Sequence, residues 1–82
     1  MHDDENFIYL TGNKSINLTP VENIVLKLLI QYKNKKILSY KEVNTKIYMS
    51  EKYMNQTISR LRKKFKGEFK IYNRKKIGYF II

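Results

Sequence analysis

The sequence predicts an α+β domain with a short N-terminal β-hairpin, three helices and a C-terminal β-hairpin. Apolar and polar residues alternate at both ends of the chain, whereas apolar residues recur at helical spacing in the middle, behind three N-cap signals. The 82 residues fit one compact domain, and 43% hydrophobic residues with seven Tyr and four Phe are far from the composition of a disordered chain. We expect a flexible tail at residues 1–6 and the domain at residues 7–82.

Two β-hairpins are predicted, one at each end of the domain. The first pairs residues 7–11 with residues 14–18 around the turn dipeptide Gly12-Asn13. The second pairs residues 69–72 with residues 77–82 around a polar, mostly basic tip at residues 73–76. The expected order is therefore strand-strand-helix-helix-helix-strand-strand.

The helices are predicted from their first residues. Thr19 is expected to cap the first helix, with Pro20 at the first helical position and Glu22 closing a capping box. Ser39 and Glu42 repeat this pattern for a second, shorter helix, after a short extended link.

The third helix is expected to begin behind Ser50 and to end at Gly67, which follows several lysines and would supply a left-handed C-cap. Apolar residues spaced by three or four positions predict one buried face on each helix. These faces are Val21, Ile24, Val25, Leu28, Leu29 and Tyr32 in the first helix, Val43 and Ile47 in the second, and Met54, Ile58, Leu61 and Phe65 in the third.

The net charge of +10 lies almost entirely at the C-terminal end. Residues 1–51 hold seven Lys and six acidic residues, whereas residues 52–82 hold ten Lys or Arg and a single acid, Glu68. A charge of this size and distribution favours an acidic partner, either nucleic acid or an anionic membrane surface.

The candidate binding residues lie in this basic region. The major groove of DNA admits a helix, and Arg, Lys, Gln and Asn can match base edges and hold phosphates. The alternative is that the helix face and the hairpin tip are only solvated and resist edge aggregation. Opposite the apolar face, the third helix presents Lys52, Gln56, Ser59, Arg60 and Lys63, with Asn55 and Arg62 along one flank, and the hairpin tip presents Arg74, Lys75 and Lys76.

An ordered set of motifs is similar to one known family. The set consists of Leu18-Thr19-x-x-Glu22, Ile47-Tyr48, Ile58-Ser59-Arg60-Leu61-Arg62-Lys63-Lys64-Phe65 and Ile77-Gly78-Tyr79-Phe80-Ile81. Together these motifs resemble the OmpR/PhoB-type winged-helix effector domain over nearly the whole chain. The resemblance implies double-stranded DNA as the partner, the third helix in the major groove, the hairpin as a wing at the minor groove, and transcriptional regulation as the outcome.

The resemblance also implies roles for single residues. Arg60 would face DNA, Arg62 would hold the DNA backbone or brace the fold, and Leu61 would lie in the core. Tyr48 would take the aromatic position, usually Trp, that closes the second helix. A homodimer on repeated half-sites is a further expectation.

The chain departs from the family pattern in three places. The connection between Tyr48 and Ile58 is several residues shorter than usual, so the RNA polymerase contact that this loop often makes in the family is not expected here. Lys76 stands where a second Gly usually precedes Gly78, so the wing is expected to differ in shape. Family members usually carry a receiver domain ahead of this one, which leaves open a stand-alone protein, a piece of a response regulator or a piece of a membrane-anchored regulator.

Other classes of function are disfavoured. The only His, at position 2, lies with three acids in the expected tail, so we expect no enzyme, no cofactor and no metal. The chain has no Cys, and its longest apolar run, residues 24–30, is interrupted by Lys27, so we expect a cytoplasmic protein without a signal peptide or membrane span. A module that binds protein or anionic lipid, or nucleic acid non-specifically, remains the alternative.

Overall fold

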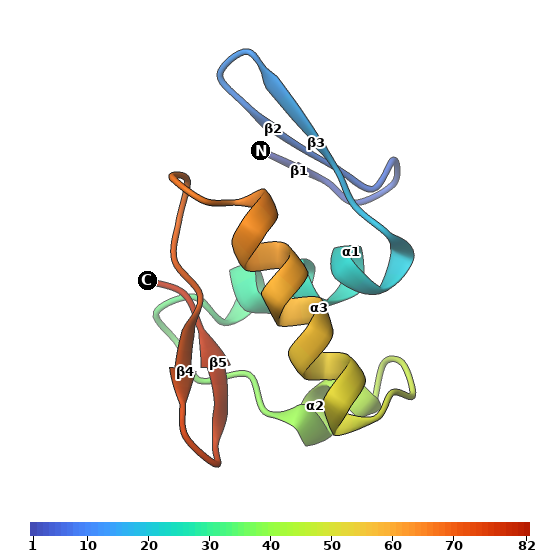
Figure 1. Ribbon diagram of the computed structural model, residues 1–82, viewed down its shortest axis with the longest axis vertical. Coiled ribbons are helices and arrows are strands. Elements are labelled where there is room, and N and C mark those ends of the chain that lie inside the picture. Colours follow the sequence, from blue (N-terminus) through green and yellow to red (C-terminus); the bar gives the residue numbers. More distant parts are fainter.

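The computed structural model describes all 82 residues, and the predicted α+β architecture is confirmed (Figure 1). All seven predicted elements are present, and one short strand precedes them. In chain order the elements are β1 (His2–Asp3), β2 (Ile8–Thr11), β3 (Lys14–Asn17), α1 (Pro20–Tyr32), α2 (Tyr40–Asn44), α3 (Glu51–Lys64), β4 (Tyr72–Arg74) and β5 (Gly78–Phe80).

The N-terminal sheet begins earlier than the sequence predicts. Residues 2 and 3, expected in a flexible tail, form β1, which pairs antiparallel with β2 in a sheet of order β1-β2-β3. His2 Nε2 lies 2.6 Å from Asn23 Oδ1 on α1, and Asn23 Nδ2 donates to Asp4 Oδ1 at 2.7 Å. These partners lie about twenty residues away along the chain. The composition of residues 1–6 alone therefore could not indicate that hydrogen bonds to α1 fix this segment.

The predicted helix starts are confirmed. Thr19 and Glu22 exchange both hydrogen bonds of a capping box at the start of α1, and Ser39 and Glu42 do the same for α2. The Ser50 hydroxyl accepts a backbone N–H of the first turn of α3 at 3.1 Å. Each cap satisfies a backbone donor that the helix itself leaves without a partner.

Two helix ends differ from the prediction. α3 ends at Lys64 with Phe65 as its C-cap, so Gly67, whose φ is +91°, lies in the turn that follows and is not the cap itself. α2 ends at Asn44, so Ile47 lies outside this helix, although it still packs against the core.

The core lies where the three helices meet. The apolar stripe of α3 is confirmed: all four of its predicted residues are at most 1% exposed. The predicted face of α1 is confirmed in part: Val25, Leu28 and Leu29 are buried, whereas Val21, Ile24 and Tyr32 are only partly buried. Leu26, which was not predicted, is fully buried. The Phe65 ring lies 5.0 Å from that of Tyr9 and stacks on that of Phe69 at 4.7 Å, so aromatic contacts join the N-terminal sheet to the end of α3.

The C-terminal hairpin, which we call the wing, is shorter than predicted. β4 and β5 pair Tyr72 with Phe80 and Arg74 with Gly78, so residues 73 and 74 belong to a strand and the turn lies at residues 75–77. Lys76 adopts a positive φ of 66°, the conformation that the second Gly of the family pattern would favour.

The wing is joined to the rest of the fold through the link between α1 and α2. The backbone of Leu38 in this link forms two hydrogen bonds with the backbone of Tyr79, at 2.8 and 2.9 Å. Gly78 permits this approach, because a Cβ at that position would lie 2.1 Å from the Leu38 carbonyl oxygen. The terminal Gly-Tyr motif therefore marks the point where the wing meets the body of the domain.

Tyr48 does not take the position that the family resemblance implies. Its side chain is 92% exposed and does not close α2. The connection between α2 and α3 is held through the next residue, Met49, which is buried. The backbone of Met49 accepts from Tyr40 Oη at 2.7 Å and donates to Asn44 Oδ1 at 2.9 Å.

Candidate nucleic-acid interface

The outward face of α3 presents the side chains that the sequence singled out. This face lies opposite the buried stripe of α3, the helix drawn in yellow and orange in Figure 1. Five of its side chains are exposed and form no hydrogen bond or ion pair within the protein, so their polar groups are available to a ligand. They are Lys52, Gln56, Ser59, Arg60 and Lys63.

The two predicted residues on the flank of α3 are exposed but have partners within the fold. The Arg62 guanidinium donates twice to the carbonyl oxygen of Ile71, at 3.1 and 2.9 Å. Of the two roles expected for Arg62, the structure therefore shows the one that braces the fold. Asn55 Oδ1 accepts a hydrogen bond from the hydroxyl of Tyr79.

The wing carries its three predicted cations at the surface. Arg74 lies in β4 and Lys75 and Lys76 lie in the turn, and none of these side chains is paired within the fold. The wing tip and the N-terminal end of α3 lie toward the same end of the molecule in Figure 1.

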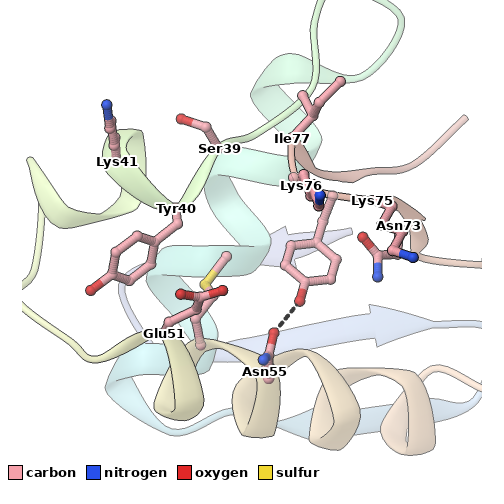
Figure 2. A pocket seen from close by; sticks show the side chains of 12 residues that line it. Ser39, Tyr40, Lys41, Glu51, Asn55, Asn73, Lys75, Lys76 and Ile77 are labelled. Atoms are coloured by element: carbon pink, nitrogen blue, oxygen red, sulfur yellow. Dashed lines mark hydrogen bonds between the residues drawn. The ribbon is translucent and has the colours of Figure 1, made fainter.

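A groove of about 600 Å³ separates the wing from the start of α3 (Figure 2). Lys75 and Lys76 line it from the wing, Asn55 and Glu51 from α3, and Lys41 from α2. Lys41 and Glu51 were not among the predicted binding residues. Glu51 lies one turn before Asn55 on the same side of α3, and this spacing could have indicated that it lines the groove. Lys41 reaches the groove only through the packing of α2, which no spacing predicts.

Three acids of the chain are paired with lysines away from the outward face of α3. Lys27 donates to Asp4 at 2.8 Å, and this bond, with one from Asn23, holds the pKa of Asp4 below its ordinary value. Lys36 donates to Glu42 at 2.8 Å and is the main reason that the pKa of Glu42 falls to about 2.

Lys64 shows that not every cation of α3 belongs to the interface. Its Nζ donates to Glu22 Oε1 at 2.6 Å and to the carbonyl oxygen of Asn17 at 2.9 Å. The Glu22 side chain is only 1% exposed, so Lys64 neutralises a buried carboxylate. Its neighbour Lys63 has no such partner.

Two further observations concern other kinds of site. No three His, Cys, Asp or Glu side chains come close enough together to hold a metal ion. None of the helices has the length and apolar character that a membrane crossing requires.

The fold is that of known winged-helix domains. No protein-family model and no curated protein sequence matches this chain. Among solved structures, the DNA-binding domain of Bacillus subtilis CssR superposes with a TM-score of 0.83 at 23% identity, covering 100% of this chain and 98% of that one. The C-terminal domain of the nisin resistance regulator NsrR, a lantibiotic response regulator, superposes with a TM-score of 0.78 at 23% identity, covering 93% and 84%. The chain therefore has the same fold as these two domains, and the predicted winged-helix fold is confirmed.

Proposed function

We propose that this chain binds double-stranded DNA sequence-selectively and thereby regulates transcription, with α3 in the major groove and the wing at the minor groove. One observation carries the proposal: five polar or cationic side chains share the outward face of α3, and none has a partner within the fold. Unpaired donors and cations on one helix face suit a ligand that offers both phosphates and base edges.

The residue types divide into two roles. Arg60 and Gln56 lie one turn apart on the outward face, and their forked donors and acceptors suit bidentate contacts with guanine and adenine. The wing offers Arg74, Lys75 and Lys76, whose charge suits phosphates beside a narrow groove. We expect α3 to supply the base preference and the wing to supply much of the affinity.

The exposed surface of α3 does not favour the alternatives. A protein-binding helix would present large apolar side chains, but the only one exposed on α3 is Tyr53, at 36%. A membrane-binding helix would present a wide apolar face beside its charges, whereas the apolar stripe of α3 is buried in the core.

A titration of fluorescent duplex DNA at several salt concentrations tests the proposal. The duplex is first selected from a random pool, and binding is followed by fluorescence anisotropy. The logarithm of the affinity should fall linearly with the logarithm of the salt concentration, by about 0.9 per phosphate contacted. Failure to bind any duplex at low salt would overturn the proposal.

Two variants separate base recognition from phosphate contact. Arg60→Ala should relax the preference for the selected sequence over its single-base variants, by about 1–3 kcal/mol at one position. Lys75→Ala should weaken binding to all sequences alike. It should also make the slope of log affinity against log salt concentration shallower, by about the value of one phosphate contact. Lys14→Ala is the matched control, because it removes the same charge from the N-terminal hairpin at the opposite end of the molecule (Figure 1).

The selection also tests whether two copies bind together. Recovered sequences with a direct repeat about one helical turn apart would support a homodimer on repeated half-sites. Single sites would support a monomer, and unrelated sequences would support non-specific binding.

A further inference from the structure

One flank of α3 is tied to the wing at two points. Asn55 accepts from Tyr79 of β5, and Arg62 donates to the backbone of Ile71 just before β4. The two residues are seven positions apart, which is about two helical turns or about 10 Å along the axis. Two attachment points at this spacing fix the wing against the helix more firmly than one could.

Tyr79 presents its hydroxyl from a well-supported position. Its backbone N–H and carbonyl are both bonded to Leu38, and its partly buried ring packs against the core. The hydroxyl extends across the groove to Asn55, as the dashed line in Figure 2 shows. The hydrogen bond therefore joins a supported side chain to an exposed one.

This hydrogen bond restricts what Asn55 can offer to a ligand. An asparagine amide has one acceptor oxygen and two N–H donors, and a bidentate match to adenine needs the oxygen and a donor together. Because Oδ1 already accepts from Tyr79, the amide is held in one orientation and its N–H donors remain for a ligand in the groove.

We infer that Tyr79 is a positioning residue that sets the base preference of Asn55. The Tyr79 hydroxyl occupies one of the two lone pairs of Oδ1 and turns this oxygen toward the wing. In this orientation Asn55 donates to an acceptor edge such as N7 and O6 of guanine, and the bidentate contact with adenine is disfavoured. This inference rests on the proposed DNA binding. It assigns a specificity role to a wing residue that contacts no base itself.

The test compares base preferences position by position. A set of duplexes carries each single-base substitution of the selected site, and binding is measured for the wild type and for Tyr79→Phe. The variant loses only the hydroxyl and keeps the ring and both backbone bonds to Leu38. At one position the preference for guanine over adenine should fall about fivefold, the effect of one neutral hydrogen bond, while other positions stay unchanged.

Two further variants make the result specific. Tyr72→Phe is the matched control, because Tyr72 also lies in the wing, stacked on Phe80 at 5.2 Å, but its hydroxyl has no partner within the fold. It should leave the base preferences unchanged. In an Asn55→Ala background, Tyr79→Phe should have no further effect at the affected position, since the amide that it orients is gone.

The failures of the two proposals are distinguishable. If the wild type binds no duplex, the proposed function itself fails. If the wild type binds selectively and Tyr79→Phe keeps the same base preferences at every position, or loses affinity equally for all duplexes, the positioning role is overturned. Thermal unfolding of each variant confirms that the comparison is made between folded proteins.

Discussion

Replacement of Lys64 by alanine removes the only cation from a carboxylate that the rest of the fold buries. Glu22 Oε1 accepts from Lys64 at 2.6 Å and from the Thr19 backbone at 2.9 Å, while Glu22 Oε2 is buried with no hydrogen-bond partner. Without Lys64, this carboxylate would keep the capping bond alone. We therefore expect the variant to be markedly less stable than the wild type.

The magnitude follows from the burial of the two partners. Removing one partner of a buried ion pair typically costs about 3–5 kcal/mol, because the other charge stays behind uncompensated. The Lys64 side chain is 35% exposed, so water can partly replace it, and we expect a loss of about 2–3 kcal/mol. In a domain of this size that corresponds to a fall in Tm of about 10–20 °C.

Thermal and urea unfolding followed by circular dichroism measures this loss. Lys63→Ala is the control one residue away, and it should change stability by no more than about 0.5 kcal/mol while weakening DNA binding. In the Lys64→Ala background, Glu22→Gln should recover part of the loss, since a neutral amide is less costly to bury. A Lys64→Ala variant as stable as the Lys63→Ala control would refute the reasoning.

The other predictions concern three positions. Gly78→Ala should cost about 1–3 kcal/mol and speed hydrogen exchange at the Leu38 amide, since the added methyl must displace the Leu38 carbonyl; an unchanged Tm would contradict this. Glu42→Gln keeps the capping box but loses the ion pair with Lys36. The pKa of Glu42 is lowered from 4.5 to about 2, so the ion pair contributes to the free energy of unfolding, by about 1 kcal/mol, above pH 4.5. This contribution is lost as the pH falls toward 2, and the stabilities of the wild type and the variant should converge at that pH. Tyr48→Ser should leave the unfolding midpoint unchanged, because the side chain is almost fully exposed.

The sequence alone determined the helices and most of the core. Capping boxes involve residues three positions apart, and the buried stripe of α3 follows from a fixed helical repeat. Such local interactions form wherever the chain is helical, so they can be predicted without knowledge of the fold. The first hairpin was predictable for the same reason, since its turn and its alternation lie within about ten residues.

Only the tertiary structure decided which polar residues of α3 are free. Asn55, Arg62 and Lys64 are polar or cationic like the unpaired side chains of α3, but their partners lie 24, 9 and 42 residues away along the chain. The same holds for β1, which is held by α1, and for Tyr48, which the packing leaves exposed. The spacing of a residue determines the face of the helix on which it lies. Its hydrogen-bond partner depends on how distant segments pack, and local sequence patterns do not predict that packing.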